Sequence, residues 1–78
     1  MEIKYTKHAS EMLAFRGIKK EQVEATIKNP DNRSKGKNGK SVLYKNFGIN
    51  YLKVVIAEEK DAVIVITNHW IVKKRIKK

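Results

Sequence analysis

The sequence contains no cysteine, a single proline and only two histidines among its 78 residues. Without cysteine the chain forms no disulfide and offers no thiolate ligand to a metal ion. The two histidines are far apart in the sequence and the carboxylates are scattered, which is not the spacing of a metal site. The sequence therefore predicts neither a metal nor a cofactor. The lack of cysteine is compatible with the reducing cytoplasm, where we expect this protein.

Long apolar runs are also missing. The longest apolar stretch, Ala62–Thr67, has the length of a strand and falls far short of a membrane span. The first residues carry no apolar run of the kind that a signal peptide needs. We therefore expect no membrane insertion. A chain of 78 residues buries only a small core, so stabilisation by a partner or as a homodimer stays open.

Acidic residues are scarce compared with basic ones. Eight Asp and Glu face eighteen Lys and Arg, for a formal net charge of +10. Part of the excess is clustered: Lys35, Lys37 and Lys40 share one polar segment, and residues 73–78 are nearly all basic. This charge favours a polyanionic partner, with RNA the first candidate, an acidic protein the second and an anionic membrane surface the third. Lysines that only aid solubility are the alternative.

Turn residues and hydrophobic periodicity predict one α+β domain over residues 1–72, followed by a basic tail over residues 73–78. Thr6 is a good N-cap for a first helix, and Gly17 suits the left-handed conformation that follows one. The polar segment 33–40 is expected to be a loop. The expected elements are a strand at 2–5, a helix from Thr6 to about Arg16, a helix at 20–28, and strands at 41–47, 49–57 and 62–70.

The arrangement of these elements follows from the short gaps between the last three strands. Such gaps favour hairpins and therefore an antiparallel sheet. The last strand is apolar on both faces in its first half, so we expect it to be internal. Strict alternation puts Val63, Val65, Thr67 and His69 on one face of it. The predicted order is β-α-α-β-β-β, with two N-terminal helices on one face of a curved antiparallel sheet.

The first predicted helix carries a stripe of chemically capable side chains. His8, Met12 and Arg16 recur every four residues, so they follow one side of the helix over about 12 Å. Imidazole transfers protons near neutral pH, and guanidinium binds phosphate through a planar fork of donors. This pair suits a phosphodiester substrate. The alternatives are a histidine with a local hydrogen bond and an arginine that stabilises the C-terminal end of the helix.

Cleavage of RNA without a metal ion needs a general base, a general acid and a cation at the phosphate. Our candidate catalytic residues are His8 and His69 for the acid–base roles and Arg16 for the phosphate. A surface position at the end of a strand is the alternative for His69. The candidate RNA-binding residues, which offer a lysine charge, a hydroxyl group or an aromatic ring, are Lys7, Lys35, Lys37, Lys40, Tyr44, Lys45, Thr67 and Trp70. Tyr51 and Lys53 repeat the pairing of tyrosine with lysine on the next strand.

Short pieces spread over residues 5–69 form an ordered pattern. They are Lys7-His8-Ala9, Arg16-Gly17-Ile18, Val23, Ile27, Asn29-Pro30-Asp31, Tyr44, Leu52, Val54-Val55 and Val65-Ile66-Thr67. This pattern resembles that of a family of short bacterial domains of unknown function. The family in turn is similar to the RelE-like and BrnT-like toxins, which share an α+β fold with barnase-type and colicin-type ribonucleases. The chain departs from the pattern at Met12, where the family often has an arginine.

The resemblance implies a metal-independent endoribonuclease, the toxin of a toxin–antitoxin pair. Such an enzyme would cleave RNA, including messenger RNA on the ribosome, by attack of the 2′-hydroxyl group to leave a 2′,3′-cyclic phosphate. It also implies an antitoxin as the protein partner, and the basic charge of this chain predicts that the antitoxin is acidic. Because Met12 removes one cation from the predicted phosphate site, a noncatalytic RNA-binding module of the same fold is the alternative. A structural or interaction domain without RNA affinity is the third hypothesis.

Overall fold

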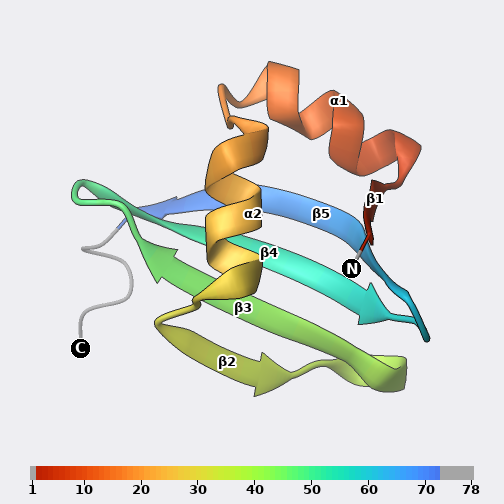
Figure 1. Cartoon of the computed structure of the whole chain (residues 1–78). Coiled ribbons are helices and arrows are strands. Elements are labelled where there is room, and N and C mark those ends of the chain that lie inside the picture. Colours follow the sequence, from red (N-terminus) through yellow and green to blue (C-terminus); the bar gives the residue numbers. More distant parts are fainter. Residues whose placement is uncertain (1, 73–78) are drawn as a thin grey trace.

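Two helices and a five-stranded sheet make up most of residues 2–72, the part of the chain that the computed structural model describes (Figure 1). In chain order the elements are β1 (Glu2–Tyr5), α1 (Lys7–Phe15), α2 (Lys20–Lys28), β2 (Asn32–Lys35), the short 3-10 helix η1 (Lys37–Gly39), β3 (Lys40–Asn46), β4 (Asn50–Glu58) and β5 (Ala62–Val72). The predicted α+β class and the β-α-α-β-β-β order are confirmed, with one strand added. The predicted basic tail lies outside the described residues.

The strands follow the order β1-β5-β4-β3-β2 across the sheet. The three long strands are antiparallel and β5 has a neighbour on each side, as predicted. The prediction of a purely antiparallel sheet is wrong, because β1 pairs with β5 in parallel and the sheet is mixed. Sequence periodicity could not reveal this pairing, since it joins segments about sixty residues apart and β1 has no hairpin partner.

The added strand, β2, lies inside the segment that we predicted to be a loop. All four of its side chains are exposed, so the apolar alternation that identifies a half-buried strand is missing. Its backbone nevertheless pairs with β3 from Asn32, opposite Tyr44, to Lys35, opposite Ser41. The prediction of a loop over 33–40 is therefore wrong for the first residues of that segment.

Local signals set the helix boundaries where they were predicted. The Thr6 hydroxyl oxygen accepts a hydrogen bond from the Ala9 amide at 3.1 Å, which caps the start of α1. Gly17 has a φ of 63°, a left-handed conformation that a residue with a Cβ rarely adopts, and it turns the chain out of α1. The second helix ends at Lys28, and its C-cap Asn29 directly precedes Pro30.

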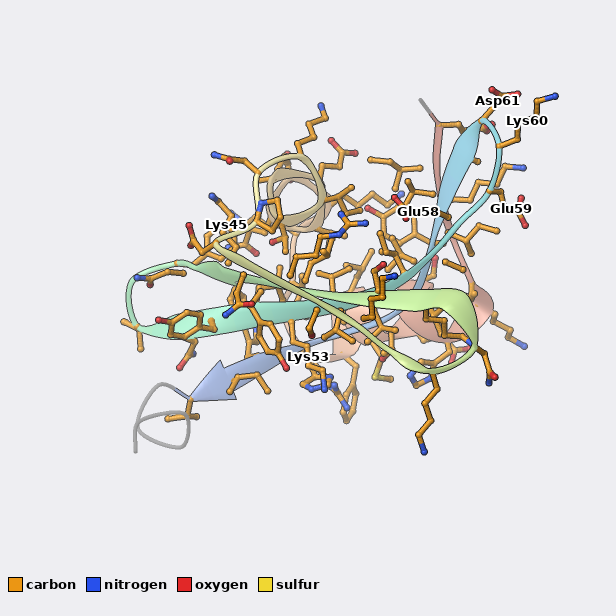
Figure 2. The ribbon with its side chains drawn as sticks, turned by 90° about the horizontal axis from the view of Figure 1, so that it is seen from below. Lys45, Lys53, Glu58, Glu59, Lys60 and Asp61 are labelled. Carbon is orange, nitrogen blue, oxygen red and sulfur yellow. The ribbon has the colours of Figure 1, made fainter. Side chains whose placement is uncertain are left out.

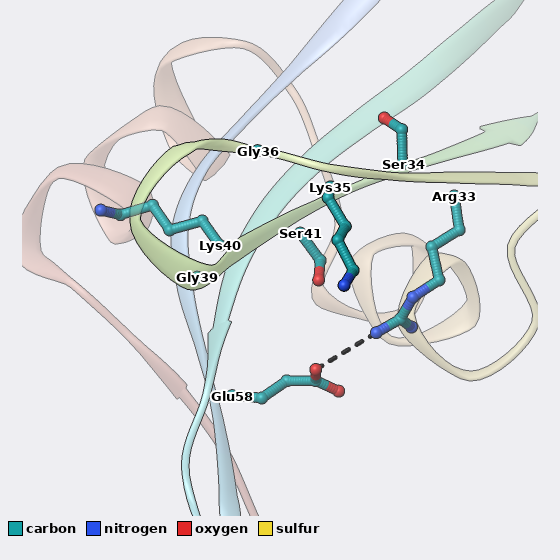
Figure 3. Close-up of a pocket in the computed structure, with 8 residues that line it drawn as sticks. All are labelled: Arg33, Ser34, Lys35, Gly36, Gly39, Lys40, Ser41 and Glu58. Atoms are coloured by element: carbon teal, nitrogen blue, oxygen red, sulfur yellow. Dashed lines mark hydrogen bonds and ion pairs between the residues drawn. The ribbon is translucent and has the colours of Figure 1, made fainter.

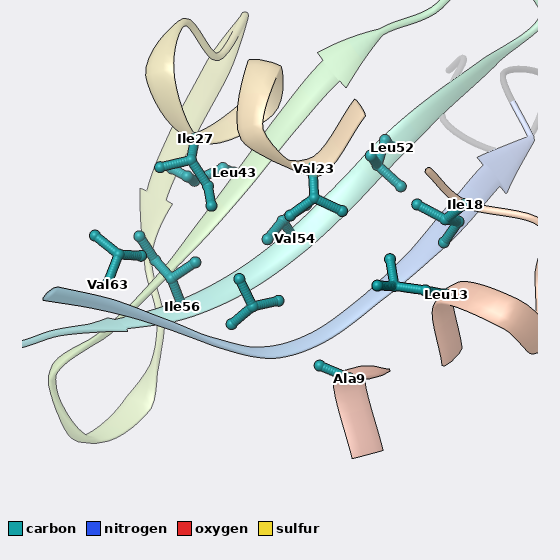
Figure 4. Packing of buried hydrophobic residues seen from close by; sticks show 11 residues of the cluster. Ala9, Leu13, Ile18, Val23, Ile27, Leu43, Leu52, Val54, Ile56 and Val63 are labelled. Atoms are coloured by element: carbon teal, nitrogen blue, oxygen red, sulfur yellow. The ribbon is translucent and has the colours of Figure 1, made fainter. Parts of the chain in front are cut away.

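The hydrophobic core lies between the helices and one face of the sheet, which we call the helix face (Figure 4). Val23 and Ile27 project from α2 toward β3 and β4, where Leu43 and Val54 are fully buried. The buried apolar residues of the core are Ala9, Leu13, Ile18, Val23, Ile27, Leu43, Leu52, Val54, Ile56, Val63 and Val65. Burial of these side chains is the main force that holds the helices on the sheet.

The opposite side of the sheet, which we call the open face, carries no helix in Figure 1. Strand register defines its residues, because directly paired side chains point to the same side. One row across the open face consists of Asn32, Tyr44, Lys53 and His69. Figure 2 shows Lys53 on the side away from α2 and Lys45 on the side of α2.

A β-bulge changes the alternation along β5. The register between β4 and β5 shifts at Val55/Ile56, so one residue of β5 is extra. As a result Val63 and Val65 lie on the helix face, whereas Thr67 and His69 lie on the open face. Strict alternation had put all four on one face, and that prediction is wrong. Neither helix within residues 2–72 is long and apolar enough to cross a membrane.

Candidate active site

Side chains at both ends of α1 bind the backbone of β5. Pairing between β1 and β5 ends at Val65, and the chain then turns into α1. The Thr6 hydroxyl donates a hydrogen bond to the carbonyl of Ile66 at 3.1 Å. At the other end of the helix, Arg16 Nη1 donates to the carbonyl of Asn68 at 3.4 Å. The helix therefore runs alongside β5, and its stripe of predicted functional residues lies against the strand.

His8 reaches the open face at the middle of β5. Its Nε2 atom lies 3.2 Å from the hydroxyl oxygen of Thr67, within hydrogen-bond distance. His8 is exposed and Thr67 is half-buried, so the imidazole remains accessible to solvent and to a ligand. Two residues that were singled out separately in the sequence, one for proton transfer and one for phosphate binding, are in contact.

His69 follows Thr67 on the same face and has cations on two sides. Lys53 is its register partner on β4, and Arg16 lies near it from α1. Partial burial, and then the positive charges of Lys53 and Arg16, lower the pKa of His69 below its ordinary value. The imidazole is therefore neutral at physiological pH. We call the five residues His8, Arg16, Lys53, Thr67 and His69 the imidazole cluster.

Buried neighbours fix the positions of this cluster. Asn68 is fully buried, and its side-chain amide donates to the carbonyl of Ala9 at 3.4 Å, which ties β5 to α1. The Trp70 indole N–H donates to the carbonyl of Arg16 at 3.1 Å, and the Trp70 ring packs edge-on against Phe47 with 6.1 Å between the ring centroids. Trp70 thus lies on the helix face and supports Arg16, away from the face on which His69 lies.

Tyr44 lines a hollow at one end of the open face, together with Asn32, Tyr51 and Ile71. The hollow has a volume of about 290 Å³. Tyr44 is the register partner of Lys53, so the hollow begins directly beside the imidazole cluster. Lys45 is not part of this surface, because its ammonium group donates to the carbonyl of Asn29 at 2.9 Å on the helix side.

The predicted RNA-binding lysines of the β2–β3 turn lie at the opposite end of the sheet. Lys35 and Lys40 line a second, larger hollow of about 710 Å³ (Figure 3). Lys37 lies between them in the sequence and is exposed within η1. Arg33 and Glu58 form an ion pair of 3.2 Å in this hollow, so one of its cations is already neutralised. Lys7 is exposed and directly precedes His8 in the chain.

Sequence reasoning missed one residue of the imidazole cluster, Lys53, and two residues of the neighbouring hollow, Asn32 and Ile71. Lys53 was noticed as a neighbour of Tyr51 but was not chosen, and Lys45 was chosen instead. The signal was present: Tyr44 and Lys45 are consecutive in a strand and must point to opposite faces. Asn32 was missed because β2 was not predicted. Ile71 was missed because the last strand was expected to end at Trp70, whereas β5 continues to Val72.

The imidazole cluster consists of two imidazoles, one hydroxyl group and two cations. Within residues 2–72, no three acidic or histidine side chains gather in a way that could hold a metal ion. What the arrangement can do is bind an anion between Arg16 and Lys53 while two imidazoles exchange protons with it.

No curated protein and no solved structure matches this chain. Residues 5–68 match the family model described as "Domain of unknown function (DUF4258)". This match extends from the end of β1 to Asn68, so it includes His8, Arg16 and Thr67 and stops before His69. The expectation that the chain belongs to a family of unknown function is confirmed. The chain is a member of the DUF4258 family.

Proposed function

We propose that this protein is a metal-independent endoribonuclease, related to the RelE-like and BrnT-like toxins, that cleaves RNA on the open face of its sheet. The observation that carries the proposal is the gathering of two imidazoles and two cations around three consecutive residues of β5, Thr67 to His69. A phosphodiester needs these groups together: proton transfer on both sides of the phosphorus atom and positive charge on its oxygens.

His69 is the general base of the proposed reaction. Its lowered pKa keeps the imidazole neutral at physiological pH, which is the state that accepts a proton. It would remove the proton of the ribose 2′-hydroxyl group as the 2′-oxygen attacks the neighbouring phosphorus. A bond between the 2′-oxygen and phosphorus forms, and the bond between phosphorus and the 5′-oxygen of the next nucleotide breaks.

His8 is the general acid. It is exposed at the first turn of α1, and its Nε2 atom lies 3.2 Å from the hydroxyl oxygen of Thr67, which shares the open face with His69. Protonated His8 would give its proton to the departing 5′-oxygen. The products are a 2′,3′-cyclic phosphate and a free 5′-hydroxyl group, so protons and bonds balance without water or a metal ion.

Arg16 and Lys53 would stabilise the charge that builds on the phosphate oxygens in the transition state. Both lie close enough to His69 to lower its pKa through their charge, and a phosphate beside His69 would therefore lie within their field. Arg16 is also fixed in place by its bond to the Asn68 carbonyl, which reduces the entropy that it loses on binding a phosphate.

The partner of such an enzyme would be an acidic antitoxin that covers the open face. The formal net charge of +10 supports this part of the proposal, because charge complementarity steers association and excludes basic partners. A noncatalytic RNA-binding module is the second candidate. It is favoured by Met12, which supplies no charge at the place between His8 and Arg16 where the similar family often has an arginine.

The test is a cleavage assay on end-labelled RNA in the presence of EDTA, with the native protein and its His8→Ala and His69→Gln variants. Each substitution is expected to lower the cleavage rate by about 10²- to 10⁴-fold, the usual contribution of a general acid or base. The fragments of the native reaction should end in a cyclic phosphate.

Ser10→Ala is the matched control, since Ser10 is exposed on α1 and is not part of the imidazole cluster. Salt-dependent RNA binding without cleavage, on free RNA and on translating ribosomes alike, would favour the noncatalytic module. Cleavage at the native rate by both histidine variants would remove these residues from the mechanism.

A further inference from the structure

The hollow at the end of the open face has the composition of a site for one flat, aromatic group. Two tyrosine rings come from neighbouring strands, Tyr44 from β3 and Tyr51 from β4, and Ile71 of β5 adds an aliphatic side. Tyr51 and Ile71 are register partners, so they lie next to one another on the sheet. The volume of about 290 Å³ is at the lower end of the range for small-molecule sites.

The rim of the hollow supplies a hydrogen-bonding group. Asn32 is exposed on the edge strand β2 and is the register partner of Tyr44. The carboxamide of asparagine carries both a hydrogen-bond donor and an acceptor. The edge of adenine also offers one donor and one acceptor, so an asparagine side chain can form two hydrogen bonds with it. Aromatic rings that stack on a base and an amide that reads its edge are the two components by which proteins recognise unpaired bases.

The place of the hollow relative to the imidazole cluster gives it a role. Lys53 lies between Tyr44 on one side and His69 on the other, all three in one row across the strands. Neighbouring strands are about 5 Å apart, so Tyr44 on β3 lies one spacing from Lys53 on β4 and two spacings, about 10 Å, from His69 on β5. This span suits one nucleotide, with its base at Tyr44 and its phosphate at Lys53 and His69. A base in the hollow would therefore belong to a nucleotide whose phosphate lies at Lys53 and His69.

We propose that this hollow is a nucleobase subsite that holds an unpaired base, adenine in preference, of the nucleotide next to the cleaved phosphate. The inference rests on the proposed function for the identity of that phosphate. It assigns base stacking to Tyr44 and Tyr51 and the choice of base to Asn32. The larger hollow at Lys35 and Lys40 lacks an aromatic ring and contains Glu58, so it does not provide such a site.

The experiment measures binding separately from cleavage, by using short single-stranded oligonucleotides with 2′-O-methyl riboses, which cannot attack the phosphate. Fluorescence anisotropy with oligoadenylate and oligouridylate gives the two dissociation constants for native protein and variants. Native protein is expected to bind oligoadenylate more tightly. Tyr44→Leu should weaken binding by at least about fivefold, the lower limit for loss of one stacked base, while Tyr44→Phe should bind like native protein.

Asn32→Ala should reduce the preference for oligoadenylate over oligouridylate, with a smaller change in overall affinity. Phe15→Leu is the control, because it removes an aromatic ring that is 80% exposed on α1, away from the hollow. Native affinity and native base preference in both Tyr44→Leu and Asn32→Ala would overturn the subsite.

A second measurement covers the case in which a variant does not fold, and the outcomes of binding and cleavage separate the subsite from the proposed function. Should Tyr44→Leu fail to fold, amide chemical shifts of native protein titrated with the 2′-O-methyl oligoadenylate replace it: shifts at Asn32, Tyr44, Tyr51 and Ile71 support the subsite, and shifts confined to other residues overturn it. The proposed function fails independently. Base binding at the hollow with no cleavage of any RNA would leave the subsite and remove the nuclease, whereas cleavage with native binding by the hollow variants would do the reverse.

Discussion

Consecutive residues of the central strands lie on opposite faces of the sheet, in different environments. Leu43, Leu52 and Val54 are fully buried beneath the helices, whereas their chain neighbours Tyr44 and Lys53 lie half-buried on the open face. The helix face gains its stability from removing apolar area from water. The open face keeps polar groups partly desolvated beside one another, an arrangement that costs stability and changes the pKa of His69.

The comparison shows which face of this small domain can carry polar and charged side chains. With a core formed by one face of one sheet, nearly every apolar contact on the helix face is needed for folding. The other face can then carry polar and charged side chains without a loss of core. We expect substitutions on the helix face to change stability, and substitutions on the open face to change ligand binding with little effect on folding.

The largest expected effect comes from a matched pair of substitutions, Val54→Ala and Val55→Ala. The two residues are adjacent in β4, have the same side chain and lie on opposite faces. Val54→Ala removes two methyl groups from a fully buried site and leaves a cavity, at a cost of about 2–3 kcal/mol in the free energy of unfolding. Val55 is only half-buried, and Val55→Ala should cost less than about 1 kcal/mol.

Thermal unfolding followed by circular dichroism measures the difference. One kcal/mol shifts Tm by about 4–8 °C in a domain of this size, so the two variants should be well separated. The loss of strand propensity is common to both variants and cancels in the comparison. Equal Tm values would contradict the assignment of stability to the helix face.

A second, smaller effect is expected at Thr6, which connects α1 to both β1 and β5. Its hydroxyl accepts from the Ala9 amide and donates to the Ile66 carbonyl, so Thr6→Ala removes a helix cap and a link to the sheet. We expect a loss of about 1–2 kcal/mol in unfolding free energy. Thr6→Ser retains both hydrogen bonds and serves as the control.

Thr6→Ala also tests whether the helix cap positions His8, because Thr6 caps the end of α1 from which His8 contacts Thr67. Native-state hydrogen exchange at the first amides of α1 should be faster in Thr6→Ala than in Thr6→Ser. Unchanged exchange there would mean that the cap does not position His8.

Features encoded by neighbouring residues were predicted from the sequence with success. Thr6 and Gly17 define the ends of α1 through a side-chain cap and a left-handed glycine, and both signals lie within a few residues of the backbone that they act on. The helical spacing of His8 and Arg16 likewise predicted that both follow one side of the helix, and the structure shows both in contact with β5.

Features that depend on distant segments were not predictable in this way. The parallel pairing of β1 with β5 and the bulge in β5 are set by tertiary packing, and neither leaves a local pattern. The bulge decides that Thr67 and His69 leave the face of Val63 and Val65, and so decides which side of the sheet carries the site. The choice between Lys45 and Lys53 depended on strand register in the same way.

The smallest expected effect is a change in the pKa of His69 in the Lys53→Gln variant. Burial is the main cause of the lowered pKa, and the charge of Lys53 is the next. Removing that positive charge makes the protonated imidazole less unfavourable, so the pKa of His69 should rise while staying below its ordinary value. NMR titration of the imidazole Cε1 proton measures this shift directly.

The dependence of the His69 pKa on salt checks independently that the charge of Lys53 contributes to it. The pH dependence of cleavage shows the consequence for catalysis. Added salt screens Lys53, so it should raise the pKa of His69 in native protein and raise it less in Lys53→Gln. Because the base must be neutral, the acid limb of the pH–rate profile should move to higher pH in the variant. Lys28→Gln, on the far side of the sheet at the end of α2, should change neither quantity. A pKa of His69 that is the same in native protein and Lys53→Gln would show that Lys53 does not contribute to it, which leaves burial and Arg16 as its causes. The row of side chains across the open face would then lack the electrostatic coupling on which its contrast with the helix face depends.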